Sequence, residues 1–316
     1  MSSSFSNILV TGATGFLGRH VVAALNEHTS AKVTGVNRSH FDLLKDDELQ
    51  DMLTSIKPDA VIHLAAKVGG IIANRDYPAD FYYENIMINT RMFDACFRHD
   101  IPKFLTFMGG CSYPATATSP IGEDQMWQGY PQIESAPYST AKKMMLVQSA
   151  SYRKQYDYNS VVLIPGNVYG EYDNFNEEYS HVIPAMIRRY IEAREAGKPS
   201  IYCYGSGRPT RDFVYAPDVA KLIPWFLENY NSSEPVNLSS GTRTAIKDLA
   251  ETIKELTGYK GTLDWDTSQP DGQMDKIFAT DRMKGLGLSC DTSLHDGLSA
   301  TIKWFEEARK TGDVRL

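Results

Sequence analysis

A tyrosine and a lysine stand four residues apart in this chain, at Tyr138 and Lys142. Four residues make about one turn of helix, so both side chains would lie on the same helical face. A phenol beside an ammonium group can donate a proton near neutral pH, because the positive charge stabilises the phenolate. Next to a nicotinamide cofactor, this pair would give a proton to a sugar or alcohol oxygen while hydride moves to carbon.

Three glycines near the N-terminus provide a second chemical signal. They follow a short apolar run and precede a stretch with apolar residues at helical spacing. Glycine permits a tight turn and lets the backbone approach a pyrophosphate, which then meets the N-terminus of the next helix. The spacing alone also fits an ordinary loop, but the flanking strand and helix favour a dinucleotide-binding turn. We expect cofactor contacts from Gly12, Thr14, Gly15, Phe16, Leu17 and Gly18.

The end of the second predicted strand discriminates between NAD and NADP. An acidic residue there would bind a free ribose hydroxyl and repel a 2′-phosphate. This chain has the neutral Asn37 followed by the cationic Arg38, which favours NADP and leaves NAD as the alternative. Arg38 could instead stack on adenine or face water. Asp42 would accept a hydrogen bond from the adenine amino group, or serve as a helix N-cap.

Short apolar runs alternate with helical stretches through the first half of the chain. Strands that alternate with helices imply a parallel sheet with both faces covered, and ligands bind such sheets outside the carboxyl ends of the strands. The predicted strands are residues 7–11, 31–36, 59–64, 103–107 and 160–164.

The alternation of predicted strands and helices becomes less regular after about Gly170, where the loops lengthen. We therefore predict an α/β fold in which a Rossmann-type, doubly wound parallel sheet is joined to a smaller, partly discontinuous substrate domain. The NAD(P)-binding domain would comprise residues 1–170, with 213–237 returning to it. The substrate-binding domain would comprise residues 171–212 and 238–316.

Composition excludes several other classes of protein. The formal net charge of −7 gives no sign of a nucleic-acid surface, and no apolar run approaches the length of a membrane span. The N-terminus is polar, so we expect no secretory signal. Cys96, Cys111, Cys203 and Cys290 are scattered, so we expect no metal centre or disulfide framework, and a reducing cytoplasm fits.

The glycine turn and the Tyr138/Lys142 pair together resemble the extended short-chain dehydrogenases/reductases. Longer segments are similar to the GDP-L-fucose synthase family, the GDP-4-keto-6-deoxy-D-mannose 3,5-epimerase/4-reductases. The resemblance covers nearly the whole chain, and these segments are far more specific than either short motif. They are residues 64–74, 77–81, 84–87, 165–170, 173–175, 180–189, 205–207, 211–213 and 270–272.

This resemblance implies two reactions in one pocket, with NADPH as reductant. A 4-keto group acidifies the hydrogens on its neighbouring carbons, so a base can remove one and an acid can return a proton to the opposite face. The resemblance assigns these proton exchanges to Cys111 and His181, whose side chains can titrate near neutral pH. It further implies that Tyr138 protonates the oxygen on carbon 4 and that Lys142 holds the nicotinamide ribose.

Further binding residues and a homodimer, formed through helices of the nucleotide domain, are implied by the same resemblance. Arginine suits a diphosphate because its planar fork can donate two hydrogen bonds at once. We rank Arg211 and Lys276 above Arg189 as ligands of the GDP moiety. The implied cofactor contacts are Leu64, Ala65, Ala66, Pro165, Asn167, Val168 and His181; the implied substrate contacts are Gly109, Gly110, Cys111, Ser112, Asn167, Arg189, Tyr204, Arg211 and Lys276.

Two positions depart from the family pattern. Gly109 stands where the family has a serine that donates to the reacting oxygen, and losing one such donor can cost about 100- to 1,000-fold in rate. We expect Ser112 to point away from Cys111 along an extended chain. Thr14 stands where the family often has an arginine beside the cofactor's extra phosphate, which leaves Arg38 to hold it.

Gly109 also keeps other functions open. The chain could catalyse epimerisation alone, or act as a dehydrogenase or epimerase on a related GDP sugar such as a heptose. A catalytically lapsed nucleotide-binding scaffold is the alternative from another class. The retained proton donors, Tyr138 and Cys111 among them, argue against a scaffold.

Overall fold

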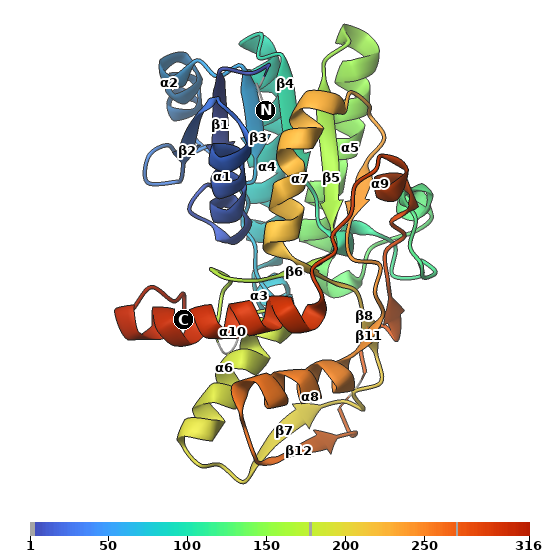
Figure 1. The fold of residues 1–316 in the computed structure, drawn as a ribbon. Coiled ribbons are helices and arrows are strands. Elements are labelled where there is room, and N and C mark those ends of the chain that lie inside the picture. Colours follow the sequence, from blue (N-terminus) through green and yellow to red (C-terminus); the bar gives the residue numbers. More distant parts are fainter. Residues whose placement is uncertain (1–3, 177–178, 270) are drawn as a thin grey trace.

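A six-stranded parallel sheet forms the centre of the larger unit in the computed structural model (Figure 1). The strand order is β10-β5-β4-β3-β1-β2, and every neighbouring pair is parallel. The five predicted strands are confirmed to within one residue at each end, and so is the doubly wound α/β fold. The strands are β1 (Asn7–Thr11), β2 (Lys32–Val36), β3 (Ala60–His63), β4 (Lys103–Phe107), β5 (Ser160–Pro165) and β10 (Val236–Leu238).

The structure describes residues 4–176, 179–269 and 271–316. The first three residues of the polar N-terminus and Pro270 of the family-like segment 270–272 lie outside the described residues. None of the described helices combines the length and the apolar character that crossing a bilayer requires.

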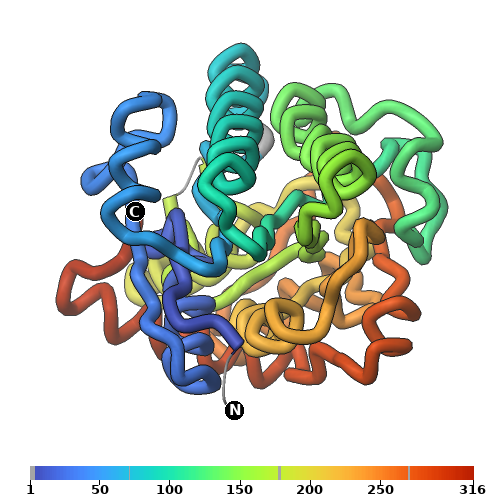
Figure 2. Tube along the Cα trace, turned by 90° about the horizontal axis from the view of Figure 1, so that it is seen from above, coloured from blue at the N-terminus to red at the C-terminus, as the bar shows by residue number. Residues whose placement is uncertain are grey.

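Helices cover both faces of the sheet, as Figure 2 shows from above. Side chains alternate along β1, so that Ile8 and Val10 join one core and Leu9 joins the other. The first core is closed by α1 (Phe16–His28) and α7 (Ala216–Asn229). The second core is closed by α2 (Asp46–Ile56), α4 (Pro78–Arg98) and α5 (Ala136–Tyr156).

The remaining elements build a smaller unit with its own hydrophobic core. In Figure 1 this unit lies below the central sheet, next to β6, the strand that follows β5. Its helices are α6 (Val182–Glu195), α8 (Ile246–Thr257) and α10 (Leu294–Thr311). Its strands pair as β6 (Asn167–Tyr169) with β9 (Phe213–Tyr215), β7 (Ser200–Tyr204) with β12 (Thr262–Asp266), and β8 (Thr210–Arg211) with both β11 (Thr244–Ala245) and β13 (Asp275–Lys276).

Short helices occupy the connections between these layers. They are α3 (Ile71–Asp76), α9 (Asp281–Gly285) and the 3₁₀ turns η1 (Gly110–Ser112), η2 (Glu123–Trp127) and η3 (Ile133–Ser135). β10 pairs with β5 in the sheet, while Met283 and Cys290 also pack into the core closed by α1 and α7. The division into two domains stays a prediction.

Candidate active site

Tyr138 and Lys142 lie in the first turns of α5, where Pro137 helps to start the helix. Burial raises the pKa of Tyr138, and the neighbouring Cys111 adds to the rise. Burial lowers the pKa of Lys142 to about 8. Desolvation is the largest cause of both shifts, and the stabilisation of the phenolate by the Lys142 ammonium stays a prediction. Tyr138 keeps its proton at neutral pH, as a proton donor must.

The Cys111 thiol and the Tyr138 hydroxyl face one small space beside Gly109. A β-carbon placed on Gly109 would lie 3.1 Å from the Cys111 sulfur and 3.8 Å from the Tyr138 oxygen. The backbone at Gly109 is extended, with φ −99° and ψ 149°, which any residue can adopt. The position of the missing serine is therefore next to both reactive groups, and the backbone does not require glycine there.

The turn η1 orients Cys111 and its two neighbours. A β-carbon on Gly110 would lie 2.4 Å from the Phe278 ring, so the ring excludes any side chain there. Ser112 does not lie on an extended chain, because its amide donates to the Gly109 carbonyl at 3.0 Å and closes a turn. The buried Ser112 hydroxyl donates to the Ser139 carbonyl at 3.0 Å. It is therefore engaged within the protein and does not replace the missing serine.

Two cations of the smaller unit lie on neighbouring strands, and the charge of one of them, Lys276, interacts with Cys111. Lys276 on β13 is the register partner of Arg211 on β8. Burial lowers the pKa of Lys276, which also feels the charges of Cys111 and Arg211. Burial lowers the pKa of Arg211 too, and its guanidinium donates to the Gln273 carbonyl at 2.6 Å. Within the described ranges neither cation forms a salt bridge, although the charge of Asp275 acts on Arg211.

Two further predicted substrate residues, Tyr204 on β7 and Arg189 on α6, belong to the smaller unit. Tyr204 and Arg211 line the same hollow of about 130 Å³, together with Asp271. Arg189 is exposed on α6 and donates to the Tyr202 carbonyl at 3.0 Å. Arg211 also donates to backbone carbonyls, so the ranking of the two arginines stays a prediction.

His181 is the N-cap residue of α6 and is exposed. Its charge acts on Asp173, a buried carboxylate whose pKa burial raises to about 6. His181 therefore lies close to Asp173, and its approach to Cys111 stays a prediction.

The glycine turn leaves the start of α1 open to an anion. Gly12 has φ +70°, and a β-carbon there would lie 2.8 Å from the Ala65 amide nitrogen. Gly15 is the N-cap of α1 and supplies no side-chain hydrogen bond, and the first turn carries no acidic residue. Uncapped amides with a positive helix end suit a pyrophosphate. The residues present therefore fit a dinucleotide, and Phe16 and Leu17 open the helix at this point.

The neighbouring predicted cofactor residues follow the strand ends. Leu64, Ala65 and Ala66 come directly after β3, and the Ala65 amide donates to the Thr11 hydroxyl at 3.3 Å. Pro165 ends β5, and Asn167 on β6 donates to the Asp212 carbonyl at 2.8 Å. The list is completed by the buried Gly18 and the half-buried Val168.

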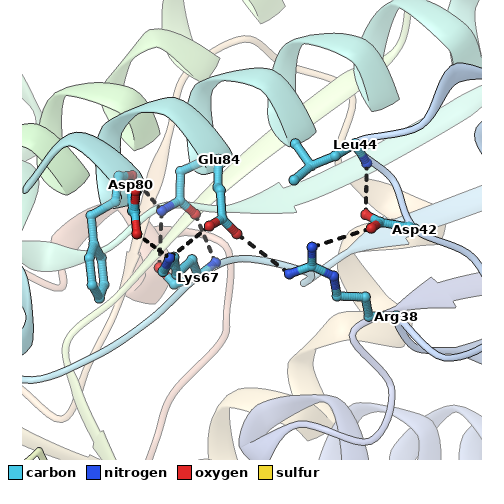
Figure 3. Close-up of polar contacts among 8 residues, drawn as sticks. Arg38, Asp42, Leu44, Lys67, Asp80 and Glu84 are labelled. Atoms are coloured by element: carbon cyan, nitrogen blue, oxygen red, sulfur yellow. Dashed lines mark hydrogen bonds and ion pairs between the residues drawn. The ribbon is translucent and has the colours of Figure 1, made fainter. Parts of the chain in front are cut away.

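The turn after β2 carries the residues predicted to choose the cofactor. Asn37 accepts from the Ser39 amide at 2.9 Å, which shapes the turn. Asp42 is not the N-cap of α2, because that position is Lys45. Its carboxylate accepts from the Leu44 amide at 3.1 Å and from Arg38 at 3.2 Å (Figure 3).

Thr14 is exposed in the glycine turn, and its carbonyl accepts from Arg19 at 3.2 Å. Its short neutral side chain cannot supply the positive charge of the arginine often found at this position in the family. Among the predicted cofactor residues of the glycine turn and of the turn after β2, Arg38 is therefore the one that carries a positive charge.

A buried polar chain behind the glycine turn was missed by sequence reasoning. The Thr11 hydroxyl lies 2.8 Å from His63 Nδ1, and His63 Nε2 lies 3.2 Å from the Asn89 side-chain oxygen. Burial lowers the pKa of His63 to about 3, and the charge of Lys142 adds to the fall. A neutral His63 thus links the turn to α4. The available signal was a polar residue at the end of each of two strands, since Thr11 and His63 are register partners.

Comparisons with known proteins agree with this arrangement. The pattern of the NAD dependent epimerase/dehydratase family matches residues 8–239. The chain is 36% identical over 307 residues to putative GDP-L-fucose synthase 2 of Arabidopsis thaliana, covering 97% of this chain and 94% of that protein. It is 35% identical over 315 residues to the GDP-L-fucose synthase of Escherichia coli (strain K12), covering 96% and 98%. The crystal structure of a GDP-L-fucose synthetase from Naegleria fowleri bound to NADP matches with a TM-score of 0.91 and 27% identity, covering 100% of this chain and 98% of that one.

Proposed function

Because the chain belongs to the NAD dependent epimerase/dehydratase family and, within it, to the GDP-L-fucose synthases, we propose that it converts a GDP-4-keto-6-deoxy-hexose by 3,5-epimerisation and 4-reduction. The cofactor is NADPH. The observation that carries the proposal is the shared space beside Gly109, which the Cys111 thiol and the Tyr138 hydroxyl both face. A proton exchanger and a proton donor at one point match the two reactions that the substrate must undergo.

The cofactor would lie across the carboxyl edge of the sheet. The open amides at the start of α1 would bind its pyrophosphate, Arg38 its 2′-phosphate and Lys142 its nicotinamide ribose. When bound, it supplies the hydride that reduces carbon 4. Tyr138 would donate its proton to the oxygen on that carbon, and the charged Lys142 would stabilise the phenolate left behind.

Epimerisation would use the acidity that the 4-keto group gives to carbons 3 and 5. Cys111 would remove a proton from each carbon, and His181 would return one from the opposite face.

The diphosphate of the substrate would bind to Lys276 and Arg211. Both cations are partly buried, and Lys276 is close enough to Cys111 for their charges to interact. A bound anion would therefore relieve charges for which the described residues form no salt bridge. Tyr204, which lines the hollow next to Arg211, would extend this contact toward the nucleoside.

The assembly and the compartment form part of the same proposal. We propose a homodimer through α4 and α5, which pack together and expose Tyr83 to 59% and Val147 to 48%. We also propose the cytoplasm, where a reducing environment would keep the Cys111 thiol free for proton exchange.

The deciding experiment mixes the protein with NADPH and GDP-4-keto-6-deoxy-mannose in deuterated water. NADPH consumption with deuterium at carbons 3 and 5 of the product would support both reactions. Deuterium exchange without NADPH loss would leave epimerisation as the one reaction that this protein catalyses. The absence of both signals would contradict the proposal. In that case a GDP-heptose is the next substrate to test, because Gly109 leaves room for a larger sugar.

Tyr138→Phe provides the matched control. It removes the proton donor and keeps the ring, so NADPH consumption should fall by about 100-fold or more while exchange at carbons 3 and 5 continues. A scaffold that only binds nucleotides would show neither reaction in either protein.

A further inference from the structure

A continuous chain of ion pairs runs between the loops that follow β2 and β3 (Figure 3). Arg38 pairs with Asp42 at 3.2 Å on one side and with Glu84 at 3.6 Å on the other. Glu84 accepts a hydrogen bond from Lys67 at 2.7 Å, and Lys67 also reaches Asp80 at 3.2 Å. Since β1 lies between β2 and β3, this chain crosses the edge of the sheet beside the glycine turn.

The charges in this chain do not cancel. Three carboxylates face two cations, which leaves the cluster with a net charge of −1. A 2′-phosphate carries about −2 at neutral pH, by analogy with a phosphoserine. Such an anion can bind Arg38 only by competing with the carboxylates that already pair with it, and those carboxylates repel the phosphate. A free ribose hydroxyl carries no charge and meets no such repulsion.

The two carboxylates on Arg38 differ in what else they do. Asp42 also accepts from the Leu44 amide, which shapes the turn that carries Arg38. Glu84 comes from α4, and it pairs with Arg38 without a hydrogen bond. Its strong bond is to Lys67, whose pKa that hydrogen bond raises. Glu84 is therefore the partner that Arg38 can leave without disturbing its own loop.

We infer that Glu84 is a specificity-determining residue, whose carboxylate competes with the cofactor's 2′-phosphate for Arg38 and weakens the preference for NADP over NAD. The inference rests on the proposed role of Arg38 as the residue that binds this phosphate. It predicts that neutralising Glu84 sharpens the preference for NADP and leaves binding of the rest of the nucleotide unchanged.

The test compares calorimetric titrations with 2′,5′-ADP, which carries the 2′-phosphate, and with ADP, which lacks it. Glu84→Gln should bind 2′,5′-ADP roughly three- to tenfold more tightly than wild type, and ADP equally well. Asp80→Asn is the matched control, because it removes the same charge from a residue that pairs with Lys67 and is 58% exposed. It should change 2′,5′-ADP binding by less than about twofold.

Three outcomes would overturn the inference. Weaker binding of 2′,5′-ADP by Glu84→Gln would mean that Glu84 positions Arg38. Unchanged binding would mean that the Arg38–Glu84 ion pair has no effect on the cofactor. Equal effects of Glu84→Gln and Asp80→Asn would mean that only the total charge of the cluster counts. Arg38→Ala tests the underlying proposal separately, because it should abolish the preference for 2′,5′-ADP over ADP. If it does not, the role of Arg38 fails whatever Glu84→Gln shows.

Discussion

The two ends of the site hold their cations in opposite ways. At the adenosine end, Arg38 is 69% exposed and is paired with carboxylates. At the substrate end, Lys276 and Arg211 are partly buried, have lowered pKa values and form no salt bridge within the described ranges. An exposed ion pair contributes little free energy, whereas a buried charge without a counterion is unfavourable until an anion arrives. The substrate end is therefore the stronger evidence for an anion site.

The largest effect that follows from this comparison concerns Lys276. Replacing it with methionine should weaken GDP binding by about 30- to 150-fold, as expected for the loss of a charge-assisted contact of about 2 to 3 kcal/mol. The free energy of unfolding should not fall, because the change removes a partly buried charge that forms no salt bridge among the described residues. Calorimetric titration and urea unfolding would measure the two quantities.

Lys303→Met is the matched control for that substitution, since Lys303 is exposed on α10 and is not among the predicted substrate contacts. It should change GDP binding by less than about threefold. A Lys276→Met protein that unfolds more easily and binds GDP normally would show that Lys276 is structural, and the contrast between the two ends would disappear.

A second effect concerns the pH dependence of stability at Lys142. Burial lowers its pKa to about 8 from an ordinary 10.5, so between these values the unfolded chain holds a proton that the folded chain has lost. The charged form therefore destabilises the fold below pH 8, and this penalty disappears as the pH rises toward 10.5.

The measurement is urea unfolding of wild type and Lys142→Met at several pH values. The difference in stability should shift in favour of wild type by roughly 1 kcal/mol per pH unit across this window. A constant difference would indicate that the Lys142 ammonium is solvated in the folded protein, and the lowered pKa of Lys142 would be wrong.

The smallest effect tests whether a hydrogen-bond donor at position 109, beside the Tyr138 hydroxyl, speeds the reduction. Gly109→Ser would place a hydroxyl beside Tyr138, and we expect it to raise the rate of NADPH oxidation by about tenfold. Gly109→Ala adds the same β-carbon, 3.1 Å from the Cys111 sulfur, without the donor. Equal rates for the serine and alanine variants would rule out a donor effect, and stopped-flow absorbance of NADPH would distinguish them.

Motifs with local geometry were the ones that sequence reasoning described well. The glycine turn and the Tyr138/Lys142 pair depend on one strand, one turn and one helix, whose periodicity is visible in a short window. The same reasoning failed where several elements meet. It expected an extended chain at Ser112, although a turn closes there, and it missed Phe278, whose ring fills the space beside Gly110.

The pKa values show the same division. An ammonium one helical turn from a phenol suggests a stabilised phenolate, because sequence conveys proximity and not solvent. The folded protein buries both groups, and desolvation then dominates the pKa of Tyr138 and of Lys142. His63 could have been noticed at a strand end, but its neutrality follows from complete burial.

The sequence by itself determined the parallel sheet, the nucleotide turn and the family, because strand and helix periodicity and long matching segments are properties of the chain. Tertiary structure alone decided which cations form salt bridges and which are partly buried without one. Arg38 meets Glu84 from α4, and Lys276 meets Arg211 across two strands that lie 65 residues apart in the chain. Those contacts depend on how separate elements pack, and packing sets both the distance between charges and their access to water.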